Sequence, residues 1–183
     1  MTNPTNPPPA TLGTRSGVGN FGLPQTIAST DEAQQFITFR IGDEEYGVDI
    51  LSVREIRGWS DVTTLPNTPD FVLGVLNLRG IILPVFDLRR RFSMGITEPT
   101  KTHVIIIVAV ENRFLGILVD GVSEILNVTA DEISAVPEMD LTIDNRFLWG
   151  LAALDERMVA LLNLGKLFDL DALPVEHETP TTA

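Results

Sequence analysis

The sequence predicts an all-β protein built from two related halves, each of about five short strands with a few helical turns. Short apolar segments separated by Gly, Pro, Asn and Asp turn signals recur between about residues 34 and 173. The longest apolar run, Val104 to Val110, has the length of a buried strand rather than of a helix. Two blocks of sequence recur in the same order, which indicates an internal duplication.

Nine segments carry the strand pattern, and three short segments look helical. The expected strands are, in chain order, residues 35–41, 46–50, 75–80, 81–86, 103–110, 114–120, 122–128, 147–154 and 158–164. The expected helical turns begin near Asp49, Asp87 and Asn163. Asp87 and Asn163 each precede a short amphipathic run, where a side-chain oxygen can accept the unpaired amide protons of a helix start.

The repeat consists of two blocks that align without gaps. Residues 74–92 match residues 150–168, and residues 36–56 match residues 105–125. Glycines, apolar positions and both capping residues coincide between the copies, so we assign these shared features to the scaffold. Because the blocks keep their order, we interpret the chain as a duplicated unit.

The duplication and the composition together predict the domain organisation. Residues 34–173 form the folded domain, with halves of about 34–97 and 98–173, each the size of a small five-stranded barrel. Residues 1–33 are rich in Pro, Thr, Asn, Gly and Ser and are expected to be a disordered tail. Residues 174–183 are expected to be a flexible C-terminal tail.

The arginines are not shared between the copies. Arg79 falls opposite Asp155, and the run Arg89–Arg91 falls opposite Gly165–Leu167. Positions that differ between the copies are better candidates for function than shared ones. For the run Arg89–Arg91 we nevertheless expect a solvated face, because consecutive helical positions point in different directions.

Composition and charge exclude several classes of function. The net charge of −12 argues against a general nucleic-acid binder, although residues 54–101 carry a local charge of +2. Without cysteine, the chain has no disulfide and no thiolate chemistry. No apolar run reaches the length of a membrane span, and the first residues do not resemble a signal peptide, so the cytoplasm is the expected location.

No pattern in the chain points to catalysis, and we expect neither enzymatic activity nor a cofactor or metal. The two histidines, His103 and His177, lack metal-ligand spacing, and His103 opens an apolar strand. The acidic run Asp43-Glu44-Glu45 is expected to lie in a solvated turn rather than to act in acid–base chemistry.

Three long motifs closely resemble one family. GDEEYGVDILSVREIRGW, NTPDFVLGVLNLRGIILPVFDLRRRF and ILVDGVSEIL are similar to the CheW-type chemotaxis coupling proteins, and the resemblance runs from about residue 34 to residue 170. It implies two SH3-like five-stranded β-barrels around a shared core. It also implies a non-catalytic scaffold of two-component signal transduction, which ties the histidine kinase CheA to the cytoplasmic tips of transmembrane chemoreceptors without itself entering the membrane.

The resemblance implies a set of contact residues. Receptor binding is expected from Val53, Glu55, Arg79, Val104 and Ile125, and Gly74 is expected near the kinase-facing side. Receptor tips are helical hairpins, so an apolar slot for a helix is the expected mode of binding, with the three aliphatic residues as its floor. Any of the three could instead be plain core. We hypothesise that Arg79 and Glu55 lie close enough to interact.

Other readings stay open at this point. One is a homologue of the CheA-type regulatory domain, which has the same fold, although the chain carries no ATP-binding module. A CheV-type fusion would need a receiver domain. A small-barrel nucleic-acid binder, or another small-barrel interaction module, belongs to a different functional class, and the net charge opposes the former.

Overall fold

The computed structural model describes residues 33–137, 143–154 and 157–168. Within these residues the chain forms two β-sheets, several short 3-10 turns and two short helices. The predicted tails, residues 1–33 and 174–183, lie outside the described residues apart from Ala33. The predicted all-β class with few helical turns is therefore confirmed.

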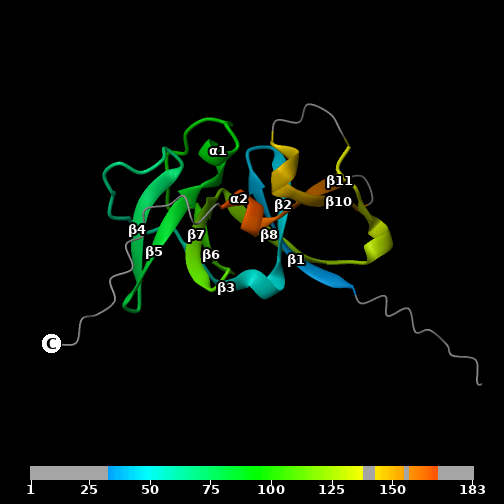
Figure 1. The fold of residues 1–183 in the computed structure, drawn as a ribbon, viewed down its shortest axis with the longest axis horizontal. Coiled ribbons are helices and arrows are strands. Elements are labelled where there is room, and N and C mark those ends of the chain that lie inside the picture. Colours follow the sequence, from blue (N-terminus) through cyan, green and yellow to red (C-terminus); the bar gives the residue numbers. More distant parts are fainter. Residues whose placement is uncertain (1–32, 138–142, 155–156, 169–183) are drawn as a thin grey trace, which may run out of the picture. The chain divides into compact units, whose positions relative to one another are not determined.

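The larger sheet, sheet A, has six strands in the order β8-β1-β2-β11-β10-β9. Sheet B has five strands in the order β3-β6-β7-β5-β4 (Figure 1). The strands of sheet A are β1 (Gln34–Ile41), β2 (Glu44–Asp49), β8 (Gly121–Val128), β9 (Ile133–Ser134), β10 (Leu148–Leu154) and β11 (Arg157–Leu162). Those of sheet B are β3 (Val53–Gly58), β4 (Val72–Leu78), β5 (Ile81–Asp87), β6 (Val104–Val110) and β7 (Arg113–Val119).

The helical elements are short and lie between strands. The 3-10 turns are η1 (Ile50–Ser52), η2 (Ala130–Glu132) and η3 (Asn145–Phe147), and the helices are α1 (Leu88–Arg91) and α2 (Leu164–Leu167). The helical starts expected near Asp49, Asp87 and Asn163 are the N-caps of η1, α1 and α2. Local side-chain chemistry therefore fixes where these turns begin.

The two sheets do not follow the two halves of the sequence. The first repeat supplies β1 to β5, yet β1 and β2 belong to sheet A while β3, β4 and β5 belong to sheet B. The second repeat makes the reciprocal contribution, since β6 and β7 join sheet B and the later strands join sheet A. The division at residues 97 and 98 thus describes the duplication in the sequence, and the repeats exchange their first two strands in space.

Because of this exchange, equivalent strands of the two repeats have equivalent neighbours in the two sheets. The first strand of one repeat pairs antiparallel with the third strand of the other, as β1 pairs with β8 and β6 pairs with β3. The second strand of one repeat pairs in parallel with the last strand of the other, as β2 pairs with β11 and β7 with β5. The two sheets therefore have equivalent strand neighbours, except that sheet A has the additional strand β9, where sheet B has only an isolated bridge between Thr63 and Val75.

An apolar core fills the space between the sheets. Its buried members come from both sheets and both helices, and include Ile37, Phe39, Val48, Phe86, Leu88, Ile106, Val108, Ile117, Leu164 and Leu167. The predicted shared core is therefore present. Burial of each large aliphatic side chain contributes about 1.5–3 kcal/mol, so the interface between the repeats is a major source of stability.

The apolar run of β6 is buried on both faces of its strand. Ile106 and Val108 point into the core between the sheets, whereas Ile105 and Ile107 pack with Leu83 and other residues of sheet B. A matching cluster inside sheet A joins residues of β1, β8, β10 and β11. Each sheet therefore curls around a small cluster of its own, and its other face packs on the shared core.

Asp87 is the buried polar anchor of the α1 region. Its carboxylate accepts hydrogen bonds from the backbone N–H groups of Arg89, Arg90 and Thr97 and from the Thr97 hydroxyl. The side chain of Asp87 is fully buried. The equivalent cap of α2, Asn163, is only half-buried and accepts from Lys166 alone through its side chain.

The predicted solvated face for the arginine run of α1 is wrong, because all three side chains bind within the molecule. Arg89 pairs with Asp120, and an Nη of Arg90 donates to the carbonyl of Asp70. Arg91 lies between two aromatic rings, 4.7 Å from the centre of Phe71 and 4.5 Å from that of Phe147. Burial lowers the pKa of Arg91 from its usual value, and the neighbouring Arg146 adds to this effect.

We expect Asp87→Ala to destabilise the fold by about 2–4 kcal/mol, because it leaves buried donors without an acceptor. The matched variant Asn163→Ala removes the equivalent cap and should cost only about 0.5–1 kcal/mol. Urea unfolding followed by circular dichroism measures both. Equal losses for the two variants would show that the burial of Asp87 adds nothing.

Candidate functional site

The structure brings two of the predicted contact residues, Arg79 and Glu55, into an ion pair. An Nη of Arg79 lies 3.1 Å from a carboxylate oxygen of Glu55. This confirms the hypothesis that the two side chains interact. The Arg79 side chain remains 78% exposed, so the pair orients the guanidinium while leaving most of it open to a partner.

The position of Arg79 is set by a tight turn between β4 and β5. Arg79 and Gly80 have φ values of 50° and 90°, the left-handed backbone that a two-residue hairpin turn requires. The side chain of Asn77 accepts a hydrogen bond from the Gly80 N–H and so stabilises the turn. The hairpin therefore projects Arg79 from the end of sheet B toward Glu55 on β3.

Val53 and Val104 lie on paired strands, but at opposite ends of the ladder. Val53 faces Val108 across the β3–β6 pairing, whereas Val104 faces Gly58. Both valines are half-buried and pack against the core between the sheets. Each valine thus contributes to the fold whether or not it also contacts a partner.

Ile125 differs from these valines in both place and exposure. It lies on β8 in sheet A, opposite Ile37 of β1, and is 53% exposed. Of the three aliphatic residues expected to form the floor of a slot, Ile125 is the one with a freely available side chain. The preceding residue, Glu124, pairs with Arg157, which also pairs with Glu45 of β2.

Gly74 is buried, and its role in the fold is plain. A Cβ at this position would lie 2.3 Å from the carbonyl oxygen of Thr63, whose backbone exchanges two hydrogen bonds with Val75. Gly150, the equivalent glycine, is crowded in the same way by Ile133. Gly74 therefore allows the segment around Thr63 to pack closely on β4.

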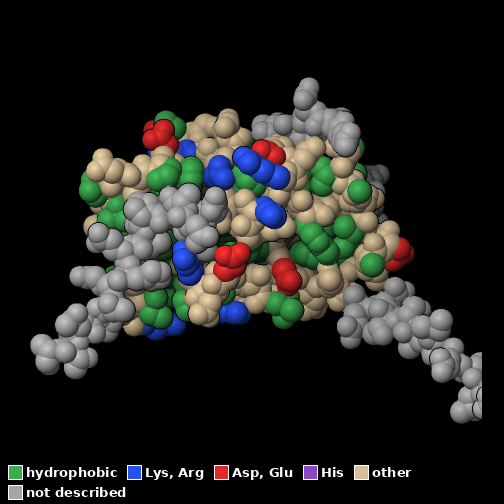
Figure 2. Space-filling view, in the orientation of Figure 1, with side chains coloured by type: hydrophobic (Ala, Val, Ile, Leu, Met, Phe, Trp, Pro, Cys, Tyr) green, Lys and Arg blue, Asp and Glu red, His purple; other side chains and the backbone are tan. Residues whose placement is uncertain are grey.

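Sequence reasoning missed exposed aliphatic residues next to the ion pair. Ile81 and Ile82 are 49% and 59% exposed, and their segment was expected only to be a strand. β5 pairs with β7 only from Val85 onward, so this end of the β4–β5 hairpin has no second neighbour. On the face drawn in Figure 2, exposed hydrophobic side chains stand among separate basic and acidic ones.

Comparison with known proteins places the chain in a family. Residues 35–172 match the family model described as a CheW-like domain. This chain belongs to the CheW-like family. It is 47% identical over 135 residues to the probable chemotaxis protein CheW of Rhizobium etli, an alignment that covers 74% of this chain and 87% of that protein.

Other relatives agree with this assignment. The chain is 44% identical to the chemotaxis protein CheW of Klebsiella aerogenes, with 80% of this chain and 89% of that protein covered. The crystal structure of the scaffolding protein TtCheW from Thermoanaerobacter tengcongensis matches with a TM-score of 0.70 and 35% identity, covering 76% of this chain and 90% of that one. These CheW-like relatives place the chain among the chemotaxis scaffold and adaptor proteins, and a kinase regulatory domain is not favoured.

Two further observations concern the part of the CheW-like chain that the structure describes. None of its helices is long and apolar enough to cross a membrane. None of its His, Asp and Glu side chains gather in a group that could hold a metal ion.

We expect Arg79→Asp to leave the stability of the fold almost unchanged. The ion pair with Glu55 is largely exposed on the arginine side and is worth about 1 kcal/mol or less, and Asp tolerates the left-handed backbone of this turn. The melting temperature measures the effect. A large drop would show that Arg79 holds the hairpin in place.

Proposed function

We propose that this CheW-like scaffold is a non-catalytic adaptor that couples a CheA-type histidine kinase to the cytoplasmic tips of chemoreceptors. The observation that carries the proposal is the exposed, oriented guanidinium of Arg79, held by a rigid turn and by Glu55. The adaptor works in the cytoplasm, next to the membrane that holds the receptors. Its partners are proteins, and neither nucleic acid nor lipid insertion is part of the proposal.

The surroundings of Arg79 suit a helical partner. Ile81 and Ile82, which follow Arg79 and Gly80 in the hairpin, offer exposed apolar surface, and Glu55 pairs with the guanidinium. Since consecutive strand residues point to opposite faces, a helix with an apolar stripe and an acidic flank could bury one of the isoleucines while its carboxylate binds Arg79. The charge would set the orientation of the helix, and the apolar contacts would supply most of the affinity.

The remaining contact residues divide into two kinds. Ile125 is exposed, so its side chain can contact a receptor directly. Val53 and Val104 are half-buried against the core, so they shape the strands that carry the contact surface. The kinase-facing contribution of Gly74 is proposed to act through the packed segment around Thr63.

Arg79→Asp should abolish retention of a receptor cytoplasmic fragment in a co-purification assay, because it reverses the charge that the helix recognises. Arg146→Asp is the matched control, since Arg146 is also exposed and pairs with an acidic residue, Asp144, at 2.8 Å. The control should retain the fragment as the unmodified protein does. Equal loss in both variants would point to net charge rather than to this site.

Ile125→Ser should weaken receptor retention while changing the free energy of unfolding by less than about 1 kcal/mol, because the side chain is half exposed. Val104→Ser should instead lower the stability by about 1–2 kcal/mol, since it places a hydroxyl against the core. Denaturant unfolding and co-purification separate the two effects. Full receptor retention by a folded Ile125→Ser variant would remove Ile125 from the contact surface.

Co-purification with both partners tests the proposed function as a whole. The protein is mixed with a purified kinase regulatory domain and a receptor cytoplasmic fragment, and one partner is immobilised. The adaptor should bring the third component onto the resin. Retention of neither partner would overturn the proposal.

A further inference from the structure

Each repeat pairs an arginine of its last hairpin with a glutamate on its edge strand. In the first repeat Arg79 pairs with Glu55, and in the second Arg157 pairs with Glu124, which the repeat alignment places at the position of Glu55. The two arginines are not themselves equivalent, because Arg79 lies in the turn of its hairpin whereas Arg157 lies in the strand that follows the turn. The same kind of ion pair is therefore built in two different ways.

Arg157 is held by two carboxylates, but Arg79 by one. The second partner of Arg157 is Glu45, at 3.1 Å, and the repeat alignment places Phe114 at the position of Glu45 in the first repeat. Among the residues that the structure describes, Glu55 is the one ion-pair partner of Arg79. A single exposed pair fixes a long side chain only weakly, so Arg79 depends on its backbone for its position.

The backbone at Arg79 is one that most side chains avoid. Its φ of 50° lies in the left-handed region, which Gly, Asn and Asp adopt far more readily than Arg does. Such a conformation persists only where its surroundings hold it. The β4–β5 ladder ends at the pair of Leu78 and Ile81, so it does not include the N–H of Gly80. The turn therefore needs a bond from outside the ladder.

Asn77 supplies this bond. Its side-chain oxygen accepts a hydrogen bond from the Gly80 N–H at 2.8 Å. Asn77 is exposed, so its side chain adds nothing to the apolar core. At the equivalent position the second repeat has Ala153, which offers no side-chain acceptor, and there two carboxylates hold the arginine. The acceptor is thus present in the repeat whose arginine lies in the turn.

We propose that Asn77 is a positioning residue for the partner contact made by Arg79. By bonding the Gly80 N–H, it keeps the Arg79 backbone in the left-handed conformation and the guanidinium beside Glu55 before a partner binds. A side chain that is ordered in advance loses less conformational entropy on binding, so the partner's carboxylate is bound more tightly. The inference rests on the proposed adaptor function, in which an acidic receptor helix contacts Arg79.

The first experiment needs no partner. Nitrogen-15 relaxation of the Arg79 Nε–H group measures how rigidly the guanidinium is held in the full-length protein. Asn77→Ala should lower the order parameter of this group, while the melting temperature stays close to that of the unmodified protein because Asn77 is exposed. An unchanged order parameter in the Asn77→Ala variant would overturn the inference.

The second experiment measures the affinity for a receptor cytoplasmic fragment by isothermal titration calorimetry. Asn77→Ala should weaken binding about three- to tenfold, the range that corresponds to one hydrogen bond. The conservative variant Asn77→Ser, whose neutral hydroxyl can accept the same N–H, should recover most of the affinity. Equal affinities of the unmodified protein and Asn77→Ala, or a loss that Asn77→Ser does not recover, would contradict the role of Asn77.

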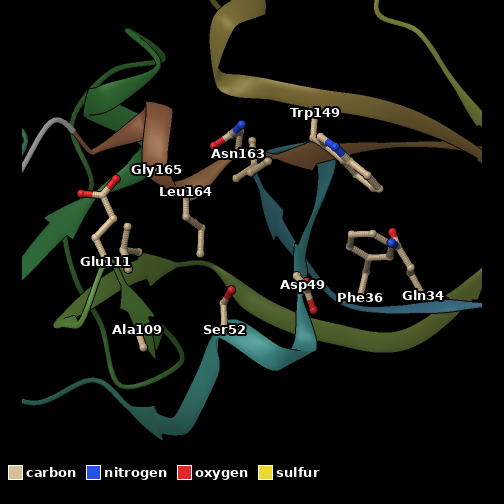
Figure 3. Close-up of a pocket in the computed structure, with 12 residues that line it drawn as sticks. Gln34, Phe36, Asp49, Ser52, Ala109, Glu111, Trp149, Asn163, Leu164 and Gly165 are labelled. Atoms are coloured by element: carbon tan, nitrogen blue, oxygen red, sulfur yellow. The ribbon is translucent and has the colours of Figure 1, made fainter.

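Asn163→Ala is the matched control, because it removes the same side chain from another capping bond. Asn163 accepts a hydrogen bond from the Lys166 N–H at 3.1 Å and lines a hollow that none of the proposed contact residues lines (Figure 3). This variant should keep both the Arg79 order parameter and the receptor affinity of the unmodified protein. Losses equal to those of Asn77→Ala would show a general effect on the fold and sink the inference.

The two experiments distinguish a failure of this inference from a failure of the proposed function. If the unmodified protein binds no receptor fragment, the adaptor proposal fails together with the role of Asn77 in affinity, and the order parameter alone shows whether Asn77 holds Arg79. If the unmodified protein and Asn77→Ala bind the fragment equally well, the adaptor proposal stands and only the role of Asn77 fails.

Discussion

The exchange of the first two strands between the repeats is the constraint on which the rest of the structure depends. Because β1 and β2 lie in sheet A while β3 follows directly in sheet B, the chain must cross between the sheets after Asp49. The reciprocal crossing follows Val119. Both crossings hold the sheets against one core, where apolar side chains from both repeats exclude water. The ion pairs and the exposed hairpin are positioned by this arrangement.

The sequence predicts the local features well, because each depends on a few adjacent residues. The caps at Asp87 and Asn163 follow from side-chain preferences that act over two or three residues. Strand exchange could not be read from the sequence, since an internal repeat is equally compatible with two separate barrels. Pairings such as β2 with β11 depend on contacts between distant segments, and no local pattern encodes them.

In the candidate site, too, contacts between residues distant in the sequence were the ones that the sequence alone did not predict. The family resemblance named Glu55 and Arg79, and the structure confirms their contact. The sequence alone predicted a solvated face for the run Arg89–Arg91, because consecutive helical positions point in different directions. Their partners, including Asp120, Asp70 and Phe147, lie far along the chain, so the burial of these arginines appears only in the folded molecule. The exposure of Ile81 and Ile82 also depends on distant pairing, since β5 lies beside β7 only from Val85 onward.

Because strands of the two repeats are hydrogen-bonded to each other in both sheets, neither repeat should fold when the other is removed. Cutting the chain between β5 and β6 would give two pieces, each lacking the strands that complete either sheet. Neither piece could close its hydrogen-bond ladders alone, but the two could recombine, as complementing fragments do. Two identical copies of a single repeat could pair by the same swap to give a symmetric dimer. Joining them in one polypeptide frees each repeat to diverge, so α1 carries Arg89 paired with Asp120 while α2 has Gly165 at the equivalent position.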